Sequence, residues 1–255
     1  MRIVTWNVNS IRARLDRLLA FLQREAPDVV CLQELKVPDE DFPFEAIRAA
    51  GYHAAVHGQR TYNGVAVFGR AIPTDVITGL GDGAADEQAR LIAATVDGVR
   101  VVSVYVPNGQ VVGSDKWDYK LAWLRRLGEW LTRNHSPGQP LVLCGDFNVA
   151  PEDRDVARLE EWRASVLCHE DARRALRGVV EWGLVDTIRL HDEGPGPYTW
   201  WDYRMLAFPK GNGLRIDHIF ATPDLARRST AARVDRDERK GKLPSDHAPV
   251  IVDFA

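Results

Sequence analysis

Apolar residues occur along the chain in two patterns, and each pattern predicts a different type of element. Short runs rich in apolar and β-branched residues predict buried strands. Such runs lie at residues 3–8, 29–32, 65–68, 75–78, 91–96, 99–106 and 141–144. Asp97-Gly98, between two of these runs, is a strong signal for a two-residue hairpin turn. Further strand-like runs lie near residues 198–201, 214–220 and 249–254.

Apolar residues that recur every three or four positions predict two long helices. The first stripe runs from Ile11 to Leu22, with Ser10 as its N-terminal cap and Pro27 at its end. The second runs from Leu121 to Leu131, and the charged region 152–181 is also expected to be helical. The strands are too many for one helix-covered sheet, and hairpins occur among them. We therefore expect an α/β fold of two packed mixed β-sheets flanked by helices.

Length, net charge and cysteine content limit which classes of protein this chain can belong to. No linker or low-complexity tract divides the 255 residues, so a single domain over residues 1–255 is predicted. The net charge of −3 does not indicate a nucleic-acid binder, but acidic residues at a metal site would mask a basic contact face. With no leader and no apolar run of membrane-spanning length, we expect a cytoplasmic protein. Its three cysteines lack metal-binding spacing and are expected to be buried, reduced thiols.

Most candidate site residues lie where a predicted strand gives way to a loop, which is a rigid mounting point. The set comprises Asn7, Glu34, Tyr105, Asp146 and Asn148 after strands, Asp217 within one, and Asp246 and His247 just before the last. Carboxylates bind hard cations, an amide and an imidazole can face a phosphate, and an aspartate can position water. The combination indicates metal-assisted cleavage of a phosphoester.

Each candidate also has an ordinary alternative. A lone acidic residue after a strand is most often a solvated loop residue. Asp146-Phe147-Asn148 is compatible with a simple Asx turn, and the segment after Pro244 with an ordinary turn. The residue types leave Tyr105, Asp146 and His247 all open as the acid or base. They also leave open whether one metal ion or two are used.

Six segments carry a resemblance to a known family. They are WNVNSIR (6–12), LQELK (32–36), YVPNG (105–109), GDFN (145–148), GLRID (213–217) and SDHAP (245–249). In order and spacing they resemble the motif series of exonuclease III-type abasic-site endonucleases, across nearly the whole chain. GDFN and SDH alone indicate only the wider endonuclease/exonuclease/phosphatase superfamily. The narrower resemblance rests on segments 6–12, 213–217 and 198–204. It implies a four-layer sandwich of two sheets between helices.

The resemblance also implies roles for the polar residues. Glu34 would be the principal magnesium ligand, with Asn7 and Asp246 shaping the metal and phosphate site; Mn²⁺ could replace Mg²⁺. Asp146 would orient or deprotonate the attacking water, while Asn148 and Tyr105 hold the phosphate. His247 would stabilise charge on a non-bridging oxygen. Asp217 would orient the imidazole and favour its charged form.

Substrate choice is assigned to another set of residues. By resemblance, Trp200, Leu214 and Ile216 would line an apolar pocket for a base-free deoxyribose, although Leu214 and Ile216 also fit a plain core strand. Trp200 and Trp201 are adjacent, so in a strand they would face opposite ways and only one of them could face the pocket. Candidates for contacts to the DNA backbone are Arg90, Asn108, Arg204, Lys36, Arg12 and Arg14. Segments 108–116 and 153–177 have no family pattern to carry over.

The resemblance implies a magnesium-dependent DNA-repair nuclease. It would act as a monomer on double-stranded DNA with abasic sites or blocked 3′ ends. Incision would fall 5′ to the abasic site, with additional 3′-to-5′ exonuclease and 3′-end-cleaning activity. Two alternatives remain open. One is a superfamily phosphodiesterase or phosphatase acting on a lipid or inositol phosphate, and the other is a non-catalytic nucleic-acid-binding module.

Overall fold

In the computed structural model, which describes residues 1–255, the chain forms two six-stranded β-sheets, here named sheet A and sheet B. In spatial order, sheet A contains β11 (Ser229–Val234), β12 (Val250–Phe254), β1 (Arg2–Asn7), β2 (Val29–Gln33), β4 (Val65–Gly69) and β3 (His53–His57). Sheet B contains β5 (Thr74–Thr78), β6 (Leu91–Val96), β7 (Val99–Tyr105), β8 (Leu141–Asp146), β10 (Asp217–Ala221) and β9 (Val185–Asp186). The β1–β2 and β7–β8 pairs are parallel and the others antiparallel, so both sheets are mixed.

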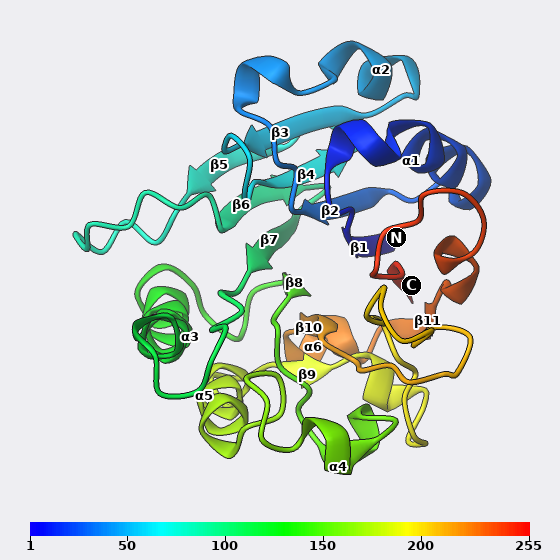
Figure 1. Cartoon of the computed structure of the whole chain (residues 1–255). Helices are drawn as coiled ribbons and strands as arrows, with labels where there is room; N and C mark the ends of the chain where they lie inside the picture. The colour runs from blue at the N-terminus through cyan, green and yellow to red at the C-terminus, as the bar shows by residue number, and fades with distance from the viewer.

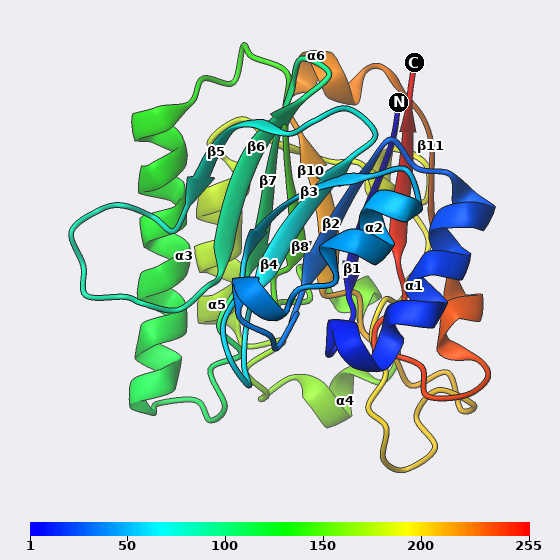
Figure 2. The same cartoon turned by 90° about the horizontal axis from the view of Figure 1, so that it is seen from above.

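Helices cover the two outer faces of this pair of sheets (Figures 1 and 2). Sheet A is covered by α1 (Ile11–Glu25) and α2 (Phe44–Ala49), and sheet B by α3 (Asp115–Asn134) and α5 (Glu170–Val180). The shorter α4 (Leu159–Trp162) and α6 (Pro223–Ala226) lie in connecting segments. The predicted α/β sandwich of two mixed sheets between helices is therefore confirmed. No helix is both long and apolar enough to cross a membrane.

The alternation of side chains along β8 shows how the layers are held together. Leu141 and Leu143 point to the helix-covered face of sheet B, where they join the core formed with α3 and α5. Val142 and Cys144 point the other way and pack against sheet A. All four side chains are fully buried, so this strand reads as a continuous apolar run in the sequence.

Local sequence signals explain several element ends. Ser10 caps α1, because its Oγ accepts a hydrogen bond from the backbone N–H of Ala13 at 3.4 Å. Ser114 caps α3 in the same way, so this helix starts before the apolar stripe that predicts it. Asp97 and Gly98 both have positive φ, 48° and 78°, as the predicted two-residue hairpin turn between β6 and β7 requires.

One local prediction is wrong, and two others hold only in part. Residues 198–201 are not a strand, because Trp200 makes only isolated bridges, to Leu214 and His247, while Trp201 turns into a small separate cluster. The strand expected over 214–220 begins only at Asp217. The region 152–181 contains the short α4 and then α5, separated by a loop that turns Val166 and Leu167 into the core. The half-exposed or very short strands β3, β9 and β11 lack a long apolar run and were not predicted.

Candidate active site

The polar candidates come together at one end of the two sheets. Asn7 ends β1 and Glu34 follows β2 in sheet A, whereas Tyr105 ends β7 and Asp146 ends β8 in sheet B. Because each of these strand pairs is parallel, its two ends meet at the same edge. His247 reaches the same place from the loop before β12. Half of the site therefore lies on each sheet.

Glu34, Asp146 and His247 form a compact group of potential metal ligands. One ligand atom from each lies within 4.8 Å of the others. The Asn7 amide joins the two acids, donating from Nδ2 to Glu34 Oε1 at 2.8 Å and to Asp146 Oδ2 at 2.9 Å. Lys36 Nζ lies 2.9 Å from Glu34 Oε2, so a cation already faces this carboxylate. The two carboxylates supply the oxygen ligands that a hard divalent cation requires.

Asp246 lies next to the group of Glu34, Asp146 and His247 but is not part of it. Its Oδ1 accepts from Asn9 Nδ2 and its Oδ2 from Trp200 Nε1, each at 2.9 Å. Burial alone would raise the pKa of Asp246, but His247 and these two donors outweigh it and lower the pKa below its usual value. Asp246 is therefore a fixed negative charge at the edge of the site.

His247 is oriented by Asp217. Its Nδ1 lies 2.9 Å from Asp217 Oδ2, which also accepts a hydrogen bond from Thr199 Oγ1 at 2.6 Å. Its Nε2 lies 3.7 Å from Asp146 Oδ2. Burial opposes a charge on the ring, but Asp217 and Asp146 outweigh burial and raise the pKa of His247 to about 10. The ring is thus a charged hydrogen-bond donor at neutral pH.

Asp146 is fully enclosed at the end of β8. Burial raises its pKa to about 7, against the attraction of His247. The preceding Gly145 is required by the close approach of β7, since a Cβ there would lie 1.9 Å from the carbonyl oxygen of Val104. The backbone N–H of Asn148 donates to Asp146 Oδ1 at 2.9 Å. This contact is the Asx turn considered as the ordinary alternative, and here it also builds the site.

Two further polar groups line the same space. Asn148 Oδ1 accepts from Asn108 Nδ2 at 3.0 Å. Burial, together with the charges of Glu34 and Asp146, raises the pKa of Tyr105 well above its ordinary value. Tyr105 is therefore a neutral phenol that can donate a hydrogen bond, and a phenolate base at this position is disfavoured.

The site opens into a cleft of about 670 Å³. Trp200 and Ile216 line it together with the polar candidates, whereas Leu214 lies behind them, fully buried in the core. The expectation that Leu214 lines the pocket is therefore not met, because its side chain packs between sheet B and its helices. Trp201 is also buried elsewhere, as the adjacency argument requires of one of the two tryptophans.

The expected DNA-backbone contacts are distributed around the cleft. Asn108 and Arg204 line it, and the Arg204 side chain is 84% exposed. Arg90 lies in an adjoining hollow that Tyr105 and Asn108 share, with its guanidinium 4.8 Å from the centre of the Tyr105 ring. Arg12 instead pairs with Asp41 at 2.9 Å.

One wall of the cleft was not predicted. It consists of Trp162 and residues 164–167, from the charged stretch that the motifs leave unassigned. The Trp162 ring meets the Trp200 ring edge to face, with their centres 5.5 Å apart. A tryptophan and a Val-Leu pair inside an otherwise charged stretch were the only signals that could have found this wall.

Residues 4–247 match the family model described as the endonuclease/exonuclease/phosphatase family. The chain belongs to this family. Among curated proteins, it is 32% identical to exodeoxyribonuclease III of Haemophilus influenzae over 266 residues, with 100% of both chains covered. The chain is also 32% identical to an exodeoxyribonuclease of Bacillus subtilis, over 98% of both chains.

Solved structures agree with this assignment. An AP endonuclease from Archaeoglobus fulgidus is 41% identical, with a TM-score of 0.96 over 100% of this chain and 99% of that one. The 3′-5′ exonuclease NExo from Neisseria meningitidis is 43% identical, with a TM-score of 0.95 and the same coverage. The resemblance to exonuclease III-type enzymes that the motifs indicate is thus confirmed.

Proposed function

We propose that this chain is a divalent-cation-dependent DNA-repair nuclease of the exodeoxyribonuclease III type. It hydrolyses the phosphodiester on the 5′ side of an abasic site and leaves a 3′-hydroxyl. It also trims DNA in the 3′-to-5′ direction and removes blocking groups from 3′ ends. The observation that carries the proposal is the convergence of Glu34, Asp146 and His247 in a cleft that apolar side chains also line.

The donor set fits a magnesium ion, and Mn²⁺ would fit the same oxygen ligands. Glu34 is the principal ligand in this proposal, with Asp146 beside it, Asp246 at the edge of the site and Asn7 orienting the carboxylates. When bound, the ion would neutralise phosphate charge and stabilise the leaving oxygen. Lys36 would give up its contact with Glu34 or share that carboxylate.

The protein groups carry out the remaining chemistry. Asp146, with a pKa of about 7, is suited to orient the attacking water and take its proton near neutral pH. His247 donates from Nε2 to a non-bridging phosphate oxygen, where negative charge grows in the transition state. Asn148 and Tyr105 hold the phosphate through the amide and the phenol, and Asp217 keeps the His247 ring in place.

Substrate selection is assigned to two apolar residues that line the cleft, Trp200 and Ile216. Trp200 and Ile216 would contact a sugar that has left the helical stack, and an abasic sugar brings no base that must be unstacked. Asn108, Arg90 and Arg204 would contact the DNA backbone. We further propose that the chain acts as a single-domain monomer in the cytoplasm.

One assay separates this function from its alternatives. Four substrates are compared with Mg²⁺ and with EDTA: a duplex carrying one abasic analogue, an undamaged duplex with a recessed 3′ end, a duplex with a 3′-phosphate, and an inositol phosphate. We expect Mg²⁺-dependent incision of the abasic duplex, with slower trimming of the undamaged end. Preferred hydrolysis of the inositol phosphate would overturn the assignment, and DNA binding without cleavage would support a non-catalytic module.

The structural neighbours supply a second candidate within the same class. The NExo structures are described as a 3′-5′ exonuclease and a 3′ phosphatase, and one of them is bound to a product DNA hairpin. Their identities to this chain, 42% and 43%, are close to the 41% of the AP endonuclease. A rate on the 3′-phosphate duplex above that on the abasic duplex would make end cleaning the main activity.

A further inference from the structure

Lys120 is a buried cation on α3 that the motifs do not single out. Its side chain is fully buried, which is rare for lysine. The ammonium donates to three backbone carbonyls, those of Asn148 at 2.6 Å, Val166 at 2.7 Å and Asn108 at 3.1 Å. Three acceptors match the three protons of an ammonium group.

These three carbonyls belong to three separate segments that surround the cleft. Asn108 lies in the loop after β7, Asn148 in the turn after β8, and Val166 in the unpredicted wall between α4 and α5. All three residues line the cleft. The Lys120 ammonium on α3 therefore connects three parts of the cleft. These are the loop of Asn108, the turn of Asn148 and the wall that contains Val166.

No carboxylate contacts the Lys120 ammonium directly. Burial lowers the pKa of Lys120 to about 7, while the charge of Asp146 acts in the opposite direction. A cation placed among neutral carbonyls costs more free energy than an apolar side chain of the same size. The site is also tightly packed, since a Cβ on Gly109 would lie 3.0 Å from Lys120 Cδ. A role in stability alone does not account for this arrangement.

We propose that Lys120 is a positioning residue for phosphodiester hydrolysis. By holding the carbonyls of Asn108 and Asn148, it fixes the mutual hydrogen bond of their side-chain amides, Asn108 Nδ2 to Asn148 Oδ1. It thereby sets where the Asn148 amide meets the phosphate. Through Val166 it also holds the cleft wall against this pair. The inference rests on the proposed function, in which Asn148 holds the phosphate.

The test combines kinetics with a double-mutant cycle. Lys120→Met keeps the length of the side chain and removes all three donors. We expect kcat to fall by about a hundredfold, as for a small displacement of a catalytic group, and KM to change by less than about threefold. Because Lys120 acts through Asn148, Lys120→Met added to Asn148→Ala should cost almost nothing more. Full additivity of the two changes would overturn the proposal.

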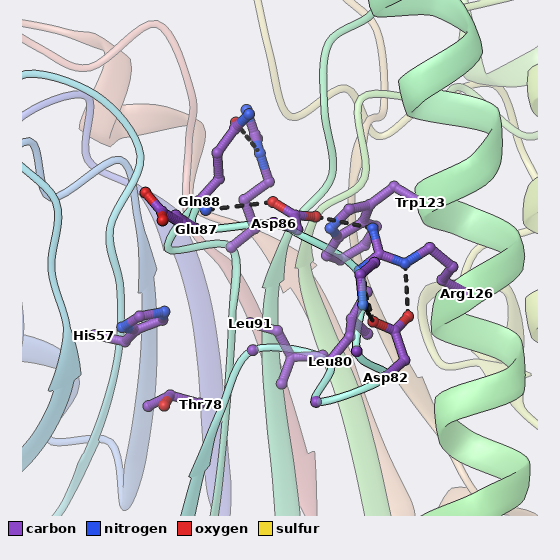
Figure 3. A pocket seen from close by; sticks show the side chains of 15 residues that line it. His57, Thr78, Leu80, Asp82, Asp86, Glu87, Gln88, Leu91, Trp123 and Arg126 are labelled. Carbon is purple, nitrogen blue, oxygen red and sulfur yellow. Dashed lines mark hydrogen bonds and ion pairs between the residues drawn. The ribbon is translucent and has the colours of Figure 1, made fainter.

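Arg126 provides a matched control on the same helix. Figure 3 shows it in another hollow, where it binds Asp82 and Asp86 at 2.6 and 2.9 Å. None of the residues that line this hollow lines the cleft. Arg126→Met also removes a cation that ties a loop to α3, but it should leave kcat unchanged. Thermal unfolding of both variants shows how much of any effect is loss of folded protein. An equal loss of kcat in both variants would overturn the proposal.

Hydrogen exchange followed by mass spectrometry tests the contacts without requiring activity. In Lys120→Met, exchange should rise in the segments around residues 108, 148 and 166, whereas in Arg126→Met it should rise around residues 82–88. Unchanged exchange at the three cleft segments would overturn the inference even if the wild type cut none of the substrates. If Lys120→Met does not fold, Lys120→Gln, which keeps an amide donor, takes its place.

Discussion

Asp146 and His247 influence each other's protonation because both are enclosed in the same pocket. Asp146 has its pKa raised to about 7 by burial, and His247 has its pKa raised to about 10 by two aspartates that outweigh burial. A carboxyl group whose pKa is higher in the folded state than in the unfolded state binds its proton more tightly when the protein is folded. The free energy of unfolding therefore falls as the pH increases from about 4 to 7. A histidine with a raised pKa contributes fully below about pH 6.5 and loses its contribution toward pH 10.

The metal-free protein should therefore lose stability as the pH rises. Asp146→Asn should remove the part of this loss that occurs below about pH 7, because the variant has no carboxyl group to titrate there. Between pH 5 and 7.5, we expect the variant to lose roughly 2–3 kcal/mol less than the wild type. Urea unfolding at a series of pH values in EDTA measures the difference. Parallel pH profiles for the two proteins would show that Asp146 does not titrate in this range.

Glu34 tests the metal assignment at a single residue. Glu34→Gln keeps the shape and the acceptor for the Asn7 amide but removes the charge that attracts a hard cation. Activity at limiting Mg²⁺ should collapse and recover only in part as Mg²⁺ is raised. A magnesium titration of the cleavage rate checks this, with Glu40→Gln, on an exposed residue, as the control. An unchanged Mg²⁺ dependence would remove Glu34 from the metal site.

At the scale of elements, the cleft combines parts that the sequence predicts well with parts that it does not. The strands that carry Asn7, Glu34 and Asp146 are buried apolar runs followed by polar residues, so both the strand and its functional end are visible in the sequence. The wall residue Trp162 belongs to the short helix α4, and its ring packs against Trp200, which is distant in the sequence. Such an element has no periodicity of its own to detect.

The position of Leu214 shows the same limit. A residue in a short irregular segment has no fixed alternation, so its side-chain direction depends on which residues bridge it, here Trp200 and Val156. Only Trp200 of the adjacent pair lines the cleft, as predicted, although the segment is not the strand on which that prediction relied. The prediction of a strand there failed because Trp200 has partners at single residues instead of a ladder.

The segment around Trp200 gives a test of substrate recognition. Trp200→Ala should weaken abasic incision by about 1–3 kcal/mol, because it removes the aromatic contact to the extruded sugar. Trp200→Phe keeps a smaller aromatic ring and loses the N–H that binds Asp246, so it should retain more of the incision activity than Trp200→Ala. The ratio of abasic incision to trimming of an undamaged end is the measurement. A large loss of thermal stability with an unchanged ratio would show that Trp200 serves only in packing.

At the scale of the whole molecule, a polar link joins the two sheets directly beneath the site. Gln33, the last residue of β2, is fully buried and donates to Thr5 Oγ1 at 3.0 Å in its own sheet and to Ser103 Oγ at 3.1 Å in sheet B. Buried polar groups of this kind fix how two apolar surfaces align, since they lose their partners if the sheets shift. We therefore expect the alignment of the two sheets at the site to depend on this contact.

Replacing this link should lower both stability and activity. Gln33→Met leaves Thr5 and Ser103 without their shared partner, so the free energy of unfolding should fall by about 1–3 kcal/mol. Gln23→Met, on the exposed face of α1, should change it by less than about 0.5 kcal/mol. Urea unfolding and the cleavage rate at saturating Mg²⁺ measure the two effects. If both variants unfold alike, the link between the sheets contributes nothing.

The division of the site between the sheets has a consequence for how the site is completed. β12 pairs with β1 although the two strands are distant in the sequence, and His247 lies just before β12. A chain truncated before residue 247 therefore lacks the imidazole and the neighbour of β1 at the same time. We expect such a chain to cut no DNA, because a single missing segment removes both a catalytic group and part of the sheet that carries Asn7 and Glu34.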